Sequence, residues 1–156
     1  MGDRDSITRH DTVVVRRTYE FGRAEVFAAW SDSAALARWY VPGDAAWTSK
    51  MRAHEFRRGG AKHLEFGPPG GPLYVEDCRY EDIVAERRIC FVMTILSDGV
   101  ALTSSLVTVE FLASGRRTEV VVTDQIAILD GSDSAADRER GWGETLDKLP
   151  RVLARQ

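Results

Sequence analysis

Residues 134–153, SAADRERGWGETLDKLPRVL, predict an amphipathic helix. Its large apolar side chains recur at intervals of four, three and four residues, which places them on one face: Trp142, Leu146, Leu149 and Leu153. Ser134 is the expected N-cap, because Asp137 follows at the spacing of a capping box. Pro150 removes one backbone hydrogen bond and predicts a kink. We therefore expect the apolar face of this helix to cover a core or a cavity.

The remainder of the chain predicts two short helices and a long series of strands. Apolar spacing indicates helices over 23–30 and 34–39, the second capped by Asp32 or Ser33. Runs rich in β-branched and aromatic residues predict seven strands: 12–21, 47–56, 61–66, 73–84, 88–96, 101–112 and 118–128. Short polar turns join these strands and favour antiparallel pairing. The order of elements predicts an α+β fold in which a curved antiparallel sheet wraps around the terminal helix.

Length and composition set the broad class of protein. The 156 residues, 44% apolar and 29% charged, fit one globular domain with a sizeable core. We expect a flexible N-terminal tail over 1–11 and a single domain over 12–156. The net charge of −3 argues against nucleic acid as a partner, because phosphate binding needs a basic surface. A small basic cluster, Arg57, Arg58 and Lys62, is expected to be a solvated strand turn.

No motif predicts a metal, a cofactor or a membrane span. The N-terminus lacks the apolar run of a signal peptide, and no stretch approaches the roughly 20 apolar residues of a membrane span, so we expect a cytoplasmic protein. In that compartment Cys78 and Cys90 are expected to be free thiols. Three histidines and two cysteines without ligand spacing predict no metal site. The glycine-rich turns lack the lysine and the strand–loop–helix setting of a phosphate loop.

Motifs along most of the chain resemble one known family. They are RTY (17–19), AEVFAAW (24–30), SD (31–32), LARWY (36–40) with Pro42, RRGG (57–60), YEDIV (80–84) with ER (86–87), and GWGETLDKL (141–149). In this order they are similar to the bacterial activator of Hsp90 ATPase homologue 1-like (AHSA1) proteins of the START/Bet v 1-like (SRPBCC) superfamily. The resemblance implies a helix-grip fold: seven antiparallel strands around a long C-terminal helix, with two short helices plugging one end. It also implies a cavity between helix and sheet that often takes an apolar molecule.

Three positions depart from the pattern of that family. Tyr40 stands where a second tryptophan is usual, and Pro150 interrupts a helix that is usually continuous. Arg52 and His54 lie in a strand whose corresponding positions are often apolar. These two residues indicate either a more polar pocket or a different side-chain orientation.

Strand alternation predicts which side chains face inward. Phe91 and Met93 share an apolar face with Ile89, and Asp124 continues the apolar set of Val120 and Val122. By the same parity, Arg52 and His54 face inward with Phe56, although a bulge would reverse this assignment.

These faces define a candidate ligand site. Its expected walls are Trp39, Phe91, Met93, Trp142 and Thr145, and its expected polar anchors are Arg52, His54 and Asp124. The alternative is that the tryptophans, Phe91 and Met93 fill a packed core, and that His54 is a strand histidine satisfied by its neighbours.

Three functions follow, in decreasing order of support. The first is binding of a small apolar or amphipathic molecule. The second is a cavity enzyme of cyclase, hydrolase or lyase type, in which His54 and Asp124 form a proton-transfer pair; no further catalytic residue is assigned. The third is a chaperone-associated interaction module, which rests on the family analogy alone. The sequence also leaves open a homodimer through the outer face of the sheet.

Overall fold

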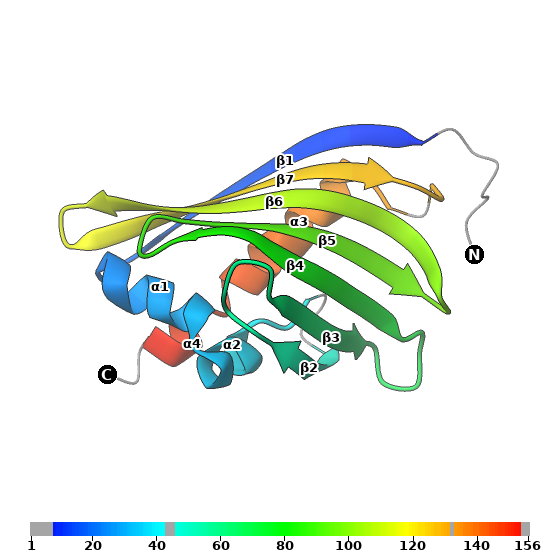
Figure 1. The fold of residues 1–156 in the computed structure, drawn as a ribbon, viewed down its shortest axis with the longest axis horizontal. Helices are drawn as coiled ribbons and strands as arrows, with labels where there is room; N and C mark the ends of the chain where they lie inside the picture. Colours follow the sequence, from blue (N-terminus) through cyan, green and yellow to red (C-terminus); the bar gives the residue numbers. More distant parts are fainter. Residues whose placement is uncertain (1–7, 43–45, 132, 154–156) are drawn as a thin grey trace.

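One curved sheet of seven strands forms the body of the protein (Figure 1). The computed structural model describes residues 8–42, 46–131 and 133–153. The strands are β1 Arg9–Tyr19, β2 Thr48–His54, β3 Ala61–Gly67, β4 Tyr74–Val84, β5 Arg88–Ser97, β6 Val100–Ser114 and β7 Arg117–Ile128. Their spatial order is β1-β7-β6-β5-β4-β3-β2, and every neighbouring pair is antiparallel. The chain therefore meanders from β2 to β7, and β1 extends the sheet beside β7.

The helices are α1 Arg23–Ser31, α2 Ser33–Trp39, α3 Ala135–Leu146 and α4 Pro150–Leu153. Figure 1 shows α1, α2 and α4 gathered at one end of the molecule, with α3 passing across the strands. Asp32 caps α2 by accepting a hydrogen bond from the Ala34 N–H, as one of the two expected caps. A seven-stranded antiparallel sheet with a C-terminal helix and two short N-terminal helices confirms the predicted helix-grip fold.

The C-terminal helix begins as predicted but does not run unbroken. Ser134 Oγ accepts the N–H of Asp137 at 3.1 Å, which confirms the N-cap. The α-helix ends at Leu146, and a turn leads to Pro150, the first residue of α4. Pro150 thus starts a new short helix, where its missing N–H costs nothing, instead of kinking a continuous one.

The inward faces of the central strands lie as predicted. Phe91 and Met93 of β5 are buried, as are Val120, Val122 and Asp124 of β7. Alternation holds here because no bulge falls between these positions in the pairing of β5, β6 and β7. This face and the buried side of α3 enclose the interior of the protein.

The predicted orientation of Arg52 is wrong. The register of β2 against β3 shifts between Met51 and Ala53, so Arg52 is the extra residue of a bulge. Its side chain lies outside, 47% exposed, in a 2.7 Å ion pair with Glu65. His54, two residues on, faces the interior and is half-buried. Arg52 and His54 therefore do not share a face, because the unpaired Arg52 interrupts the alternation of β2.

The prediction that Lys62 is solvated is also wrong. It belongs to β3 and is buried, 1% exposed, instead of lying on a solvated turn with Arg57 and Arg58. The turn before β3 does carry the two arginines on its exposed side. Cys78 and Cys90 are free thiols, the first buried and the second half-buried. No helix within the described residues is long and apolar enough to span a membrane.

Candidate functional site

A cavity of about 960 Å³ lies between the sheet and α3. The apolar part of its wall comes mainly from β3, β4, β5, β6 and the segments beside them: Tyr40, Pro42, Trp47, Phe66, Pro72, Tyr74, Met93, Ile95, Val100 and Leu102. From α3 it receives Arg138, Gly141, Trp142 and Thr145, which follow at helical spacing and share one face. The exposed positions of Pro72, Asp98 and Gly131 mark the side at which the cavity meets solvent.

A buried ion pair forms part of the cavity wall. Lys62 Nζ lies 3.1 Å from Glu76 Oε2, and the two side chains are 1% and 2% exposed. The Tyr40 hydroxyl donates to the same carboxylate at 3.1 Å, and the Cys78 thiol donates to it at 3.4 Å. Lys62 Nζ also lies over the rings of Tyr40 and Phe91, 4.0 and 4.4 Å from their centroids.

This surrounding keeps Lys62 charged. Burial alone would lower its pKa, but the adjacent Glu76 carboxylate raises the pKa of Lys62 well above the usual value. Burial, reinforced by Glu76, also raises the pKa of Tyr40 well above its ordinary range, so Tyr40 remains a hydroxyl donor. Glu76 lines the cavity and Lys62 lies behind it, so a ligand that reaches Glu76 meets a carboxylate whose charge is already balanced by Lys62.

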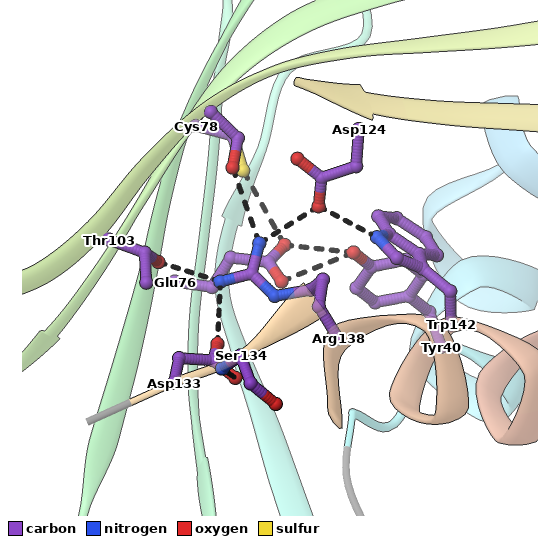
Figure 2. A network of polar contacts seen from close by, with 10 residues as sticks. Tyr40, Glu76, Cys78, Thr103, Asp124, Asp133, Ser134, Arg138 and Trp142 are labelled. Atoms are coloured by element: carbon purple, nitrogen blue, oxygen red, sulfur yellow. Dashed lines mark hydrogen bonds and ion pairs between the residues drawn. The ribbon is translucent and has the colours of Figure 1, made fainter. Parts of the chain in front are cut away.

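A second network surrounds Arg138 (Figure 2). Its Nη1 lies 2.8 Å from Asp124 Oδ2 and its Nη2 lies 3.1 Å from Asp133 Oδ2. The same nitrogens donate to Ser105 Oγ at 3.2 Å and to Thr103 Oγ1 at 2.7 Å. The guanidinium is therefore held by two carboxylates and two hydroxyls from β6, β7 and the segment that precedes α3, and it has little freedom to move.

Asp124 anchors this network from behind the wall. It is fully buried, and its Oδ2 also accepts the indole N–H of Trp142 at 3.0 Å. Its other oxygen, Oδ1, is buried with no hydrogen-bond partner among the described residues. Asp124 thus positions two residues that do line the cavity, Arg138 and Trp142. This is a positioning role, and the predicted role of direct ligand anchor stays untested.

The aromatic side chains of the wall form two groups. Trp47 and Tyr74 stack, with centroids 5.7 Å apart and planes 11° from parallel, and Phe66 packs 5.5 Å from Tyr74. In the second group, the rings of Tyr40 and Trp142 meet edge to face, with centroids 6.2 Å apart. Both groups therefore offer apolar and π surface to an occupant.

Three of the predicted ligand residues line the cavity: Met93, Trp142 and Thr145. Trp39 does not, because it is fully buried among Trp30 and Tyr40 and donates its indole N–H to the Ala29 carbonyl at 2.8 Å. Phe91 also packs behind the wall, against Tyr80 and below Lys62. The packed-core alternative therefore describes Trp39 and Phe91 better than the pocket interpretation.

His54 lies apart from Asp124. Its Nδ1 is 2.7 Å from Ser33 Oγ and its Nε2 is 3.0 Å from the Tyr80 hydroxyl, so both ring nitrogens have partners. Burial, followed by the charge of Lys62, lowers the pKa of His54. Burial raises the pKa of Tyr80 to about 12, which leaves it an uncharged partner. His54 is satisfied by its neighbours, and the geometry does not bring it together with Asp124.

Sequence reasoning missed the polar residues of the wall. Arg138 could have been found, because it precedes Trp142 by four residues and Thr145 by seven and so shares their helix face. Glu76 alternates with Cys78 and Tyr80 on the buried face of β4. Within the described residues, no three His, Cys, Asp or Glu side chains are grouped as a metal-ion site.

Comparisons with known proteins agree with the fold. A sequence profile described as activator of Hsp90 ATPase homolog 1-like protein matches residues 20–154. The crystal structure of the Mll3558 protein from Rhizobium loti shares 36% sequence identity at a TM-score of 0.83, covering 94% of this chain and 99% of that one. A putative uncharacterized protein from Rhizobium leguminosarum shares 30% identity at a TM-score of 0.85, covering 96% and 98%. No functionally curated protein matches the chain.

A more distant match shows how far this fold extends. DynU16, a putative protein in the dynemicin biosynthetic locus, shares 18% identity at a TM-score of 0.68. The match covers 93% of this chain and 48% of DynU16, so it shows the fold alone. The family profile spans most of the chain, and the sequence motifs and the arrangement of sheet and helices agree with it. The chain therefore belongs to the activator of Hsp90 ATPase homolog 1-like (AHSA1) family.

Proposed function

We propose that this protein binds a small apolar or amphipathic molecule in the cavity between the sheet and α3. The cavity itself carries the proposal: about 960 Å³ is at the upper end of the range typical of ligand pockets. A wall with ten apolar or aromatic residues and a few fixed polar groups is the usual composition of such a pocket.

Burial of the ligand would supply the affinity. Each 100 Å² of apolar ligand surface removed from water contributes about 2.5 kcal/mol before the entropic cost of binding is subtracted. Glu76 and Arg138 are held rigidly by their partners, so they would offer fixed hydrogen-bonding groups to an uncharged polar group in the body of the ligand.

The enzymatic alternative receives no support from the predicted pair. Proton transfer between His54 and Asp124 needs direct contact or one bridging water, whereas His54 contacts Ser33 and Tyr80, and Asp124 contacts Arg138 and Trp142. A chaperone-associated role stays a prediction that no contact in the structure tests. Binding of a small molecule is therefore the function that the described contacts support best.

Gly141 allows a direct test of the cavity. It lies in the middle of the α3 face that lines the cavity, and a Cβ built on it meets nothing within 4 Å. A side chain at this position therefore begins in open space on the face that lines the cavity. We therefore compare Gly141→Trp, which places an indole in the binding space, with Gly141→Ala, which makes the same backbone change and leaves the space open.

The assay is titration with N-phenyl-naphthylamine, an uncharged dye whose fluorescence rises in apolar surroundings. We expect saturable binding to the wild-type protein and to Gly141→Ala, and an affinity about tenfold weaker for Gly141→Trp. Native mass spectrometry of protein purified from its own host, followed by extraction, would then identify the natural occupant. Equal affinity of all three proteins would place the dye elsewhere, and absence of saturable binding would contradict the proposed function.

A further inference from the structure

The cavity wall carries an excess of negative charge. Five carboxylate side chains line it, against a single cationic side chain among the described lining residues, Arg138. The carboxylates are Glu76, Asp98, Asp130, Asp133 and Asp137. A cleft lined by one sign of charge and bounded by apolar walls concentrates its field on whatever enters.

The cations near the cavity are already engaged with carboxylates. Arg138 contacts both Asp124 and Asp133, so that group of three side chains is itself negative. Lys62 is matched to Glu76 in the buried pair. No described cation of the wall is therefore left to receive an anionic ligand.

Further cations beside the wall do not reverse the balance. Arg140 pairs with Asp137 at 2.7 Å, and Arg9 donates to the backbone carbonyl of Asp133 at 3.3 Å. Lys148 donates to the Val41 carbonyl, between the lining residues Tyr40 and Pro42. When these two arginines, Lys62, Lys148 and the buried Asp124 are counted with the lining residues, carboxylates still outnumber cations among the described side chains.

Aromatic faces lie beside Asp98, an exposed carboxylate of the cavity wall. Tyr74 pairs with Ser97 in the sheet, so the turn carrying Asp98 lies beside the stack of Trp47, Tyr74 and Phe66. Asp98 makes no ion pair with any described residue and is exposed. An aromatic face beside a carboxylate is the combination that favours an organic cation, through cation–π attraction and through charge.

We propose that the cavity selects an apolar molecule carrying a positive charge, as a protonated amine or a quaternary ammonium group. This inference rests on the proposed ligand-binding function and adds the chemical class of the ligand. The apolar body occupies the interior beside Met93, Ile95 and Leu102, and the cationic group remains at the open end near Asp98 and Asp137. An anion of the same shape meets net repulsion there.

The test uses three fluorescent probes that share a pyrenebutyl body and differ in the head group. Pyrenebutyl-trimethylammonium is cationic, pyrenebutanol is uncharged and pyrenebutyrate is anionic. We expect the cation to bind at least about tenfold more tightly than the anion, with the alcohol between them. The preference should shrink when the salt concentration is raised from about 0.05 M to about 0.5 M, because ions screen charges that face solvent.

A double variant locates the charge that sets the preference. Asp98→Asn with Asp137→Asn removes two exposed carboxylates of the wall, and asparagine tolerates the left-handed backbone of residue 98 (φ 52°). The matched control is Asp77→Asn with Glu119→Gln, which changes net charge equally on strand residues that do not line the cavity. We expect the cation preference to fall about threefold or more in the first variant and to persist in the control, with pyrenebutanol binding unchanged in both.

The outcomes separate the two proposals. Binding of pyrenebutyrate as tight as that of the cation would overturn the charge preference, while tight pyrenebutanol binding would still uphold the cavity as a ligand site. A preference that survives in the Asp98/Asp137 variant would overturn the placement of the cationic group at the open end. Failure of all three probes to bind would overturn the ligand-binding function together with this inference.

Discussion

Removing the buried cation Lys62 tests the energetics of the cavity wall most sharply. In Lys62→Met the side chain keeps a similar volume, but Glu76 is left buried and charged with only the donors of Tyr40 and Cys78. Breaking a buried ion pair by removing one partner costs about 3–5 kcal/mol. Since the whole protein is stable by about 5–15 kcal/mol, this change alone would consume a large part of its stability.

A double-mutant cycle also requires the variant that removes the other charge, Glu76→Gln. Glu76→Gln keeps an amide oxygen that accepts the Tyr40 hydroxyl, but it leaves the Lys62 ammonium buried without an anion. We expect a cost of about 3–5 kcal/mol for this variant as well. In the double variant Lys62→Met/Glu76→Gln no charge remains buried, so its loss should be only about 1–2 kcal/mol, and the coupling energy should be at least about 4 kcal/mol.

Urea denaturation of the four proteins measures these values, provided that the slope with denaturant stays constant across the set. Each single variant should also melt about 10 °C below the wild type, since about 2–4 °C accompanies each kcal/mol in a protein of this size. Single variants that lose less than about 1 kcal/mol, or a double variant whose loss equals the sum of the singles, would refute the buried pair as the structure shows it.

Three further results are expected. Burial, and then the charge of Lys62, lowers the pKa of His54, so the unfolded chain binds a proton at this site more readily than the folded protein does. The contribution of neutral His54 to stability is therefore present above about pH 6.5, the pKa of an unperturbed histidine, and is lost as the pH falls below that value. The free energy of unfolding of the wild type should therefore drop more between about pH 7.5 and pH 5.0 than that of His54→Gln, and equal drops would contradict this reasoning. Tyr40→Phe removes a buried donor from the Glu76 carboxylate and should cost about 1.5–3 kcal/mol in urea denaturation, whereas a neutral result would show that the hydroxyl does not make this bond. Gly143→Ala should leave the free energy of unfolding nearly unchanged. The gain of about 1 kcal/mol in helix propensity is offset because the new methyl group would lie 2.7 Å from the Arg17 guanidinium and must displace it. Stabilisation by the full amount would show that Arg17 moves aside without loss.

The sequence was sufficient for the elements because their signals are local. Period-two alternation, turn residues and the helix stripe each depend on neighbours along the chain, and they predicted the seven strands and the N-cap at Ser134. Strand ends moved by a few residues where turns decide them. The strand predicted over 47–56 ends at His54, because the Glu55 carbonyl accepts the N–H of Arg57 in the turn that leads to β3.

The orientation of Arg52 could not be predicted, because a bulge is a property of two strands. The register shift between Met51 and Ala53 is visible only in the pairing of β2 with β3, and the alternation of residues 47–56 does not predict it. The same limit applies to His54 and Asp124. Both face the interior, but side chains that face the same interior are not thereby in contact, and their partners come from α2, β4 and α3.

Lys62 shows a different kind of error, in which a general expectation overrode a local signal. Lys62, Leu64 and Phe66 alternate along β3, so the parity that buries the two apolar residues also buries the lysine. A lone buried lysine would be costly enough to justify rejecting that parity. The cost is offset by Glu76, which contacts Lys62 diagonally from β4, two residues from its paired position Cys78, and is buried by the same parity that buries Cys78 and Tyr80. A lysine and a glutamate that alternation places on the inward faces of adjacent strands can neutralise each other, so their parity together predicts a buried ion pair at this position.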